Sequence, residues 1–512
     1  MASFPGLVLT IIAVINIIQI FSSSVWAAKE DTYERILNLK SDPEDDITIF
    51  GGNDMDLDTT FRPEDLPTLC RNFYAALPKR NFNPWGGKRG GFNPWGGKRQ
   101  LTNTESTNNY HGEWDNERFH AHGGYLEVEQ PSYKGMEETY CKAAEEVGVP
   151  RLDLNAEFME GCSPIYYTQK NGRRYDTYHA FLKPIQDRQN LFIRKYSHVT
   201  KILFQGAQNY AVGVEYIRHE DLESLQIKVL ADRPVGKNLQ DHVSSLIGPF
   251  IVDEPISVDL DKNLTVSAVL SFAKRGEGIL SSSGIQATSF LVSEVAKSRN
   301  QSDWPDIQHM LLGKSVNRQA DVQYSRNYNT RLEVMEKFLK EAKGKHSFQI
   351  MNILARPFSK GQIKLDGTDP LRSPHLDPNY FENGLDLNVL VEGAKRAVDL
   401  VENSPTFQAL NGRLHKIAFP GCEHFSFRSD DYWECYHRHY SLTVHHPCGT
   451  CAMGKTDSPD AVVDSQLRVI GTKNLRVIDA SIMPHLTTGN IHAPTIMIAE
   501  MGADIIKSTW NE

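Results

Sequence analysis

Apolar residues recur at helical spacing in three stretches of the chain. From 135 to 147 they stand three or four positions apart, which predicts a helix. The same pattern predicts an amphipathic helix over 386–401. A third predicted helix begins at Pro494, because the fixed φ and missing N–H of proline cost nothing in a first turn, and it runs to about Lys507.

Short runs of β-branched and aromatic residues predict strands between these helices. The runs lie at 120–128 (after a glycine turn), 190–193, 199–204, 214–217, 348–354, 361–365 and 475–478. We expect 190–193 and 199–204 to pair with each other, and 475–478 to form a buried strand that stops at Asp479. The mixture of strands and helices predicts an α/β chain, α+β overall.

The N-terminus begins with an almost continuous apolar run at 7–21, followed by three serines and a small-residue site. This pattern predicts a secretory signal peptide over 1–28 and therefore a secreted, extracellular protein. An uncleaved membrane anchor is the alternative. The run is short for a bilayer span of ~20 residues and contains Asn16 and Gln19, so we favour cleavage. No other segment of the sequence reads as a stable membrane span.

Residues 29–99 combine an acidic, weakly periodic stretch with a short repeat, and we expect them to be disordered. The sequence Phe-Asn-Pro-Trp-Gly-Gly-Lys-Arg occurs at 82–89 and again at 92–99. Dibasic pairs bracket each copy, and glycine and proline keep such a backbone open to proteases. A glycine-rich linker is the alternative, but identical repetition of two aromatic residues and a proline favours proteolytic processing.

Cleavage at the dibasic pairs would leave a C-terminal glycine on each copy, and oxidation of that glycine would leave an amide. The residues implied in processing are Lys79, Arg80, Gly86, Gly87, Lys88, Arg89, Gly96, Gly97, Lys98 and Arg99. The Phe-x-x-Trp-Gly-amide ending resembles the kinin neuropeptides of arthropods, of the leucokinin type. That resemblance implies a peptide precursor whose products act on a G-protein-coupled receptor.

Composition narrows the classes of function. The formal net charge is −9, so the chain lacks the basic surface that binds nucleic acid. Seven cysteines are too few and too oddly numbered for a disulfide scaffold, and their pairing stays open. Cys448 and Cys451 have redox-motif spacing, but the block around them favours another role. No histidines stand with carboxylates or thiolates at ligand spacing, so we expect no metal site.

The C-terminal part carries an ordered set of motifs. The segment 445–454 reads His-His-Pro-Cys-Gly-Thr-Cys-Ala-Met-Gly, and 475–484 reads Leu-Arg-Val-Ile-Asp-Ala-Ser-Ile-Met-Pro. The segment 488–500 reads Thr-Gly-Asn-Ile-His-Ala-Pro-Thr-Ile-Met-Ile-Ala-Glu, and upstream 234–242 reads Pro-Val-Gly-Lys-Asn-Leu-Gln-Asp-His. In this order the motifs resemble the glucose–methanol–choline (GMC) oxidoreductase family, from about residue 100 to the C-terminus.

The resemblance implies FAD as cofactor and a small-molecule alcohol or sugar that is oxidised at its CH–OH group. In the family, a histidine and a second His or Asn flank the substrate hydroxyl, and these correspond to His446 and Asn490. An imidazole with a pKa near ~6.5 is suited to accept the hydroxyl proton, and an amide can donate to the developing alkoxide. The cofactor contacts implied are Val199 on the adenine side, Asp479 and Ala480 at the ribityl–pyrophosphate stretch, and Thr495 beside the flavin pyrimidine.

The same resemblance divides the chain. Residues 100–245 and 440–512 correspond to a truncated, Rossmann-like FAD-binding domain, and 246–439 to a substrate-binding domain with a mainly antiparallel sheet and flanking helices. The family begins with a strand–Gly-x-Gly-x-x-Gly–helix unit that seats the FAD pyrophosphate, and this sequence contains no Gly-x-Gly-x-x-Gly. We therefore hypothesise that the chain does not hold FAD tightly. A kinin-like prohormone, or a chimera of a peptide precursor with an oxidoreductase, is the alternative.

Overall fold

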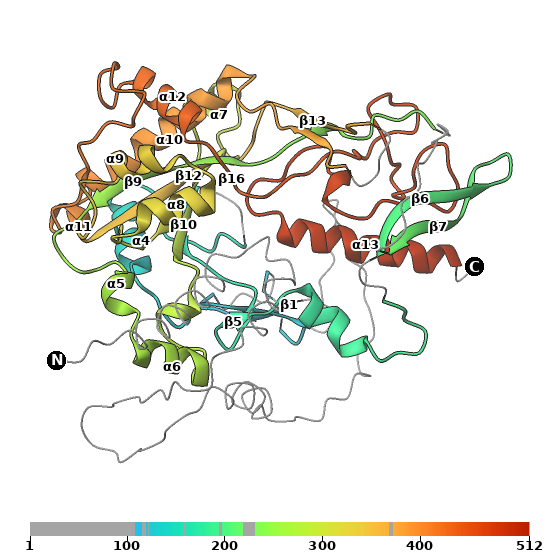
Figure 1. Ribbon diagram of the computed structural model, residues 1–512, viewed down its shortest axis with the longest axis horizontal. Coiled ribbons are helices and arrows are strands. Elements are labelled where there is room, and N and C mark those ends of the chain that lie inside the picture. The colour runs from blue at the N-terminus through green and yellow to red at the C-terminus, as the bar shows by residue number, and fades with distance from the viewer. Residues whose placement is uncertain are drawn as a thin grey trace, which may run out of the picture. The chain divides into compact units, whose positions relative to one another are not determined.

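The computed structural model describes residues 108–114, 119–120, 122–156, 160–193, 197–218, 231–367 and 372–510 (Figure 1). All of these residues belong to one compact unit, Arg89–Glu512. The predicted signal peptide, the repeated peptide and the dibasic sites lie outside the described residues. The predicted domain boundaries therefore stay predictions.

A seven-stranded antiparallel sheet forms the centre of this unit. Its strands are β3 (Gly161–Pro164), β9 (Val243–Ile251), β10 (Ile285–Leu291), β11 (Ile307–Leu312), β12 (Ser347–Leu354), β15 (Arg413–Leu414) and β16 (Leu442–Thr443). They lie in the order β15-β9-β12-β11-β10-β3, with β16 also paired to β9. All nine residues of β9 are buried, so the sheet is covered on both faces there. This confirms the predicted mixed fold with an antiparallel sheet.

Helix α10 (Gly384–Asn403) packs on the sheet against β12, and α12 (Asp430–His439) packs in turn on α10 (Figure 1). The Asn383 side chain caps α10 by accepting a hydrogen bond from the Leu385 N–H. Buried positions 387, 390, 394, 397 and 401 repeat every three or four residues and form the face that packs on the sheet. The predicted helix over 386–401 is confirmed.

A disulfide between Cys141 and Cys162 joins helix α4 (Glu137–Glu146) to β3. Helix α4 confirms the helix predicted over 135–147, and β2 (Leu126–Glu129) confirms the strand expected after the glycine turn. The disulfide therefore fastens the edge of the sheet to the segment that precedes it.

Shorter elements connect these parts. The remaining strands away from the central sheet are β1 (Asn108–His111), β4 (Gln169–Lys170), β5 (Arg173–Arg174), β8 (Lys237–Leu239), β13 (Gly361–Lys364) and β14 (His375–Asp377). The shorter helices are η2 (Tyr178–Leu182), η3 (Lys183–Ile185), α5 (Leu260–Asn263), α6 (Val266–Arg275), η4 (Ile279–Ser281), α7 (Glu294–Ser298), α8 (Ala320–Tyr328), α9 (Leu332–Phe338), α11 (Pro405–Gln408) and η5 (Ala480–Ile482). β12 and β13 confirm the strands predicted over 348–354 and 361–365.

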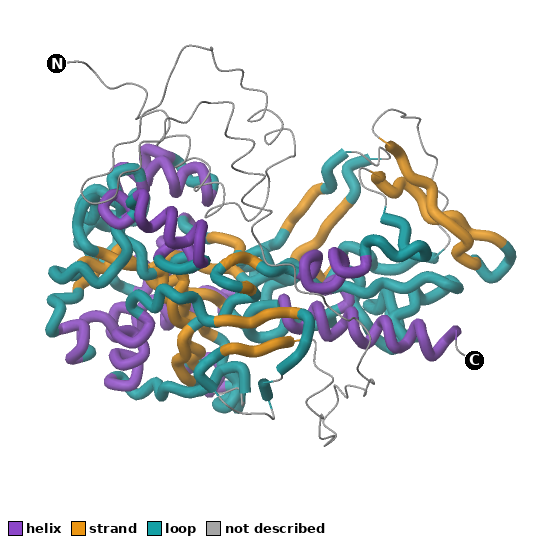
Figure 2. The backbone as a smooth tube through the Cα atoms, turned by 90° about the horizontal axis from the view of Figure 1, so that it is seen from below, coloured by secondary structure: helices purple, strands orange, loops and turns teal. Residues whose placement is uncertain are grey.

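A separate hairpin of β6 (Ser197–Gln205) and β7 (Tyr210–Arg218) projects from the rest of the described chain (Figures 1 and 2). It contains the strands predicted over 199–204 and 214–217. The expected pairing of 199–204 with 190–193 is wrong, because 190–193 is not a strand. Gly206 and Asn209 adopt positive φ and close a tight turn, so 199–204 pairs with the strand that follows it.

The strand predicted at 475–478 is also wrong. This segment is only half-buried, and Arg476 forms an isolated bridge with Arg468. The backbone of 475–478 bonds to the segment 467–469, where the Val469 N–H donates to the Leu475 carbonyl at 2.9 Å and the Val477 N–H donates to the Leu467 carbonyl at 3.1 Å. This single antiparallel bridge is too short to make 475–478 a regular strand of a sheet. Helix α13 (His492–Trp510) follows, and it starts two residues before the predicted Pro494, which lies in its first turn.

Candidate active site

Two loops that the sequence separates by some forty residues meet on one short segment, 238–242. The N–H of Cys448 donates to the Gln240 carbonyl at 2.9 Å, and the Gln240 N–H donates to the Cys448 carbonyl at 3.1 Å. The Gln240 side chain also accepts from the Leu486 N–H at 3.2 Å. The segment 238–242 therefore fixes the loop before Cys448 and the loop after Leu486 relative to each other.

Gly449 shows how closely these loops approach. Its φ is +89°, and a Cβ built there would lie 2.5 Å from the Asn238 carbonyl oxygen. Only glycine accepts both the dihedral angle and the contact. The glycine of the predicted His-Pro-x-Gly-Thr motif thus holds the backbone that carries His446.

The two loops bring the predicted pair together. Asn490 Nδ2 lies 3.4 Å from His446 Nε2. The His446 ring is half-buried and Asn490 is exposed, so the pair lies at the protein surface. An acceptor nitrogen and a donor amide facing one point are suited to hold a hydroxyl group between them.

Asp241 holds the backbone of His446 in place through a hydrogen bond. Its Oδ1 accepts from the His446 N–H at 2.9 Å, and its Oδ2 accepts from the Thr443 hydroxyl at 2.6 Å. The hydroxyl of Tyr380 donates to the same oxygen. Burial lowers the pKa of the His446 imidazole below its ordinary value, while the Asp241 carboxylate opposes that shift and the neighbouring His445 adds to it.

His242 lies behind the His446 ring. The two Nδ1 atoms are 2.9 Å apart, and His242 Nε2 is 3.0 Å from the Ala355 carbonyl oxygen. His242 is fully buried, and burial, followed by the proximity of His446, lowers its pKa to about 3. His242 is therefore neutral near pH 7. Sequence reasoning placed it only at the end of a loop motif.

A second residue that sequence reasoning missed, Gln308 of β11, reaches the pair from the central sheet. Gln308 Nε2 donates to Asn490 Oδ1 at 3.4 Å and to the Thr288 hydroxyl oxygen at 3.2 Å. Neighbouring residues in a strand point to opposite faces, so Gln308 faces the pair while His309 faces α10. No sequence signal separates this glutamine from other buried polar residues.

The four predicted cofactor residues lie in three places. Val199 is exposed on β6, beside a register shift in its pairing with β7. Ala480 accepts from the Gly449 N–H at 3.3 Å, and Asp479 accepts from the Ser481 N–H at 2.8 Å. The Thr495 hydroxyl, in the first turn of α13, donates to the Ile491 carbonyl at 2.7 Å.

A cavity of about 700 Å³ opens beside this site. Lys237, Asn238, Lys360, Glu382 and His485 are among its lining residues. Neither His446 nor Asn490 lines it. The geometry of the pair, rather than this cavity, therefore defines the candidate site.

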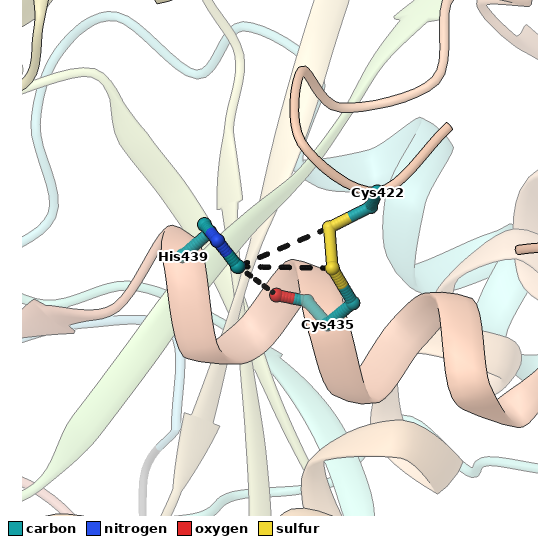
Figure 3. A group of neighbouring side chains, drawn as sticks. All are labelled: Cys422, Cys435 and His439. Carbon is teal, nitrogen blue, oxygen red and sulfur yellow. Dashed lines mark hydrogen bonds between the residues drawn. A yellow bond between two sulfur atoms is a disulfide. The ribbon is translucent and has the colours of Figure 1, made fainter. Parts of the chain in front are cut away.

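Two cysteines and a histidine cluster on α12 and the loop before it, as Figure 3 shows. Cys422 and Cys435 form a disulfide, so neither sulfur is a free thiolate. His439 Nδ1 lies 2.9 Å from the Cys435 carbonyl oxygen and donates to it. The two sulfur atoms are bonded to each other and His439 Nδ1 is hydrogen-bonded to a carbonyl oxygen, so this cluster is not suited to hold a metal ion.

The other two described cysteines do not form a redox pair. Cys448 and Cys451 are both unbridged, and Cys448 is buried. Burial raises the pKa of the Cys448 thiol to about 12, so the reactive thiolate is disfavoured. Among the described residues there is also no helix with the length and apolar character that a membrane crossing requires.

Two family models, both described as GMC oxidoreductase, match this chain at residues 87–235 and 357–499. The glucose dehydrogenase (FAD, quinone) of Drosophila pseudoobscura pseudoobscura is 32% identical over 77% of this chain and 65% of that protein. The alcohol dehydrogenase (acceptor) of Pseudomonas putida is 30% identical over 77% of this chain and 72% of that protein. The chain spans 65% of the length of the Drosophila relative.

Solved structures share the fold. Formate oxidase of Aspergillus oryzae superposes with a TM-score of 0.63 at 19% identity, over 79% of this chain and 77% of that one. Pyridoxine 4-oxidase from Mesorbium loti superposes with a TM-score of 0.58 at 24% identity, over 77% of this chain and 74% of that one. The matches to the family models and to the bacterial alcohol dehydrogenase show that the chain belongs to the GMC oxidoreductase family.

Proposed function

We propose that this protein is an FAD-dependent oxidoreductase that oxidises the CH–OH group of a small alcohol or sugar. The observation that carries the proposal is the 3.4 Å contact between His446 Nε2 and Asn490 Nδ2 at the protein surface. Relatives named as glucose, alcohol and choline dehydrogenases support the substrate class.

His446 is the proposed base. Its Nε2 takes the hydroxyl proton of the alcohol, and its lowered pKa keeps the ring neutral and ready near pH 7. The Asn490 amide donates to the same substrate oxygen and stabilises the negative charge that develops there as the proton leaves. Asp241 holds the His446 backbone in place during this transfer. FAD, when bound, supplies the acceptor for the hydride that leaves the carbon.

Among the described residues, we propose contacts for the ring end and the adenine side of FAD. Thr495 in the first turn of α13, Asp479 and Ala480 are the residues we propose for the ring and ribityl contacts, and Val199 for the adenine side. The sequence has no Gly-x-Gly-x-x-Gly to cradle the phosphates. We therefore propose weak FAD binding, and titration of the purified protein with FAD, followed by dialysis and visible absorbance, tests it. A stoichiometric flavin that survives dialysis contradicts weak binding.

Activity is tested with FAD-supplemented protein, an artificial electron acceptor and a panel of sugars, choline, and aliphatic and aryl alcohols. We expect His446→Ala to reduce turnover of the best substrate by about 10²- to 10⁴-fold, the usual contribution of a general base. His485→Ala is the matched control, because His485 is exposed in the neighbouring loop and, among the described residues, forms no hydrogen bond with His446 or Asn490. Absence of turnover with every alcohol contradicts the proposed function.

A second function is carried by the repeated Phe-Asn-Pro-Trp-Gly-Gly-Lys-Arg at 82–89 and 92–99. We propose that a secreted precursor, directed by the signal peptide at 1–28, releases amidated kinin-like peptides that act on a G-protein-coupled receptor. Mass spectrometry of tissue extracts, with isotope-labelled synthetic amides as standards, tests this proposal. Detection of only unprocessed protein contradicts it. Transcript reads across the codon for Arg99 test whether the peptide and oxidoreductase parts are joined in one message.

A further inference from the structure

An unbroken series of side-chain hydrogen bonds runs through the candidate pair and ends on a backbone carbonyl at each side. In order it contains Ala355 O, His242, His446, Asn490, Gln308, Thr288 and His309 O. A carbonyl oxygen can only accept a hydrogen bond, so each end fixes the direction of the bonds that follow it.

The Ala355 carbonyl sets the direction from one side. His242 Nε2 lies 3.0 Å from that oxygen and must carry a hydrogen to bond with it. The Thr487 backbone also lies close to this ring. Because His242 is neutral, a hydrogen on Nε2 leaves Nδ1 as a bare acceptor. His446 Nδ1, at 2.9 Å, must therefore donate, and the Nε2 of the neutral His446 ring is left without a hydrogen.

The His309 carbonyl sets the direction from the other side. It accepts from the Thr288 hydroxyl at 3.0 Å, so the Thr288 oxygen is an acceptor for Gln308 Nε2. The same Gln308 amide nitrogen donates to Asn490 Oδ1 at 3.4 Å. A flipped Gln308 would set its oxygen against the Thr288 oxygen, whose one hydrogen goes to the His309 carbonyl.

The two directions agree where they meet. Gln308 requires the oxygen of the Asn490 amide on its own side, which turns Asn490 Nδ2 toward His446. His242 independently requires a bare Nε2 on His446, which is the acceptor that Asn490 Nδ2 needs. The direction set by the Ala355 carbonyl does not depend on the direction set by the His309 carbonyl, so the two constraints are independent.

We propose that His242 and Gln308 are positioning residues that preset the proton acceptor and the hydrogen-bond donor before any alcohol arrives. This inference rests on the proposed role of His446 as the base. His242 is fully buried and Gln308 is 2% exposed, whereas Asn490 is exposed. The rigid ends of the series therefore lie in the protein interior, and the two atoms they orient face the substrate side.

The array also suits the proton transfer itself. The O–H bond of the alcohol breaks, a new N–H bond forms at His446 Nε2, and the existing Nδ1–H stays in place. The resulting imidazolium donates to the bare Nδ1 of His242, and a hydrogen bond to the charged form favours it. His242 thus plays the part that a carboxylate plays in other histidine-dependent sites, without placing a charge in the interior.

Nitrogen-15 NMR of histidine-labelled protein at pH 8 measures the tautomers directly, whether or not the enzyme turns over. We expect His446 to carry its hydrogen on Nδ1 and His242 on Nε2, with the signals assigned through His446→Ala and His242→Asn. A His446 ring with its hydrogen on Nε2 overturns the proposal. The expected tautomers in a protein that oxidises no alcohol would instead contradict the proposed function alone.

Three substitutions at His242 separate positioning from packing. In His242→Asn the side-chain oxygen can reach the place of Nδ1, in His242→Gln the amide can reach the place of Nε2, and His242→Phe supplies neither. We expect His242→Asn to keep the Nδ1–H tautomer of His446 and most of kcat. In His242→Gln and His242→Phe we expect that the His446 hydrogen is no longer held on Nδ1. The loss of kcat in the latter two is expected at about 10- to 100-fold, smaller than when a charged partner is removed. Equal effects of all three, tracking only their stability, overturn the proposal.

Discussion

Asn490 Nδ2 and His446 Nε2 lie 3.4 Å apart although they come from two different loops. Each atom is turned toward the other by a buried residue behind it, His242 for the histidine and Gln308 for the asparagine. The pair therefore depends on groups that never touch the substrate. Several measurable consequences follow from that arrangement.

The pH dependence of kcat/KM is expected to report the neutral form of His446. Burial lowers the pKa of this ring, so activity should persist as pH falls below the ordinary value of ~6.5 and decline only at lower pH. The measurement is kcat/KM of the FAD-saturated protein between pH 4.5 and 9. An acidic limb centred well above pH 6.5 would show that another group, or a raised pKa, controls the reaction.

Gln308→Glu preserves the shape of the side chain but replaces the donor that faces Asn490 Oδ1 with an acceptor. The Asn490 amide is expected to turn over and present its oxygen to His446, and kcat/KM should fall by about 10- to 100-fold. Gln408→Glu, on the exposed surface of α11, adds the same charge without touching the site and should leave kcat/KM unchanged. Similar kcat/KM values for the two variants would contradict the proposed role of Gln308 in orienting the Asn490 amide.

Gly449 offers a test of backbone geometry. Gly449→Ala combines an unfavourable φ of +89° with a Cβ 2.5 Å from the Asn238 oxygen, so the loop must shift. We expect a loss of about 1–3 kcal/mol in the free energy of unfolding and a large fall in kcat. Gly148→Ala is the matched control, with φ +91° and no heavy atom within 4 Å of the added Cβ. It should cost about 1 kcal/mol and leave kcat intact. Urea unfolding and initial rates distinguish the two.

Acid should destabilise the fold through buried histidines. Burial lowers the pKa of His242 and of His437 to about 3, and of His309 and of His415 to about 4. The unfolded chain binds these protons below about pH 6.5 while the folded chain does not. The stabilisation is therefore complete above pH 6.5 and is lost as pH falls toward 4.

The corresponding measurement is the free energy of urea unfolding at a series of pH values. Each such histidine contributes up to about 1.4 kcal/mol per pH unit in this window. His437→Gln keeps a donor for the Leu390 carbonyl and removes one titrating ring, so the slope should decrease by about that amount. An unchanged slope would mean that His437 is protonated in the folded state.

The sequence was sufficient where local periodicity decides the structure. The three- and four-residue spacing over 386–401 predicted α10, and the motif order predicted that His446 and Asn490 would be neighbours. The apolar run at 475–478 misled, because a strand also needs partners on its edges, and periodicity says nothing about them. The strand at 199–204 shows the same limit, because the turn after it pairs it with β7 and not with the segment 190–193.

His242 and Gln308 could not be identified from the sequence for a related reason. A buried histidine at the end of a loop motif and a glutamine in a strand carry no local signal of what they face. Their roles depend on the pairing of 240–242 with 444–448 and on the register of β10 and β11, which long-range packing sets. The predicted cofactor contacts at Val199, Asp479, Ala480 and Thr495 stay predictions until flavin binding is measured.

Chemical rescue of His446→Ala is the most direct measurement of the central claim that His446 takes the hydroxyl proton of an alcohol. With FAD and the best alcohol, kcat/KM of the variant should fall by about 10²- to 10⁴-fold, and added imidazole should restore part of it. His485→Ala should match the wild-type protein with or without imidazole. Wild-type activity in His446→Ala, within about threefold, would contradict the account.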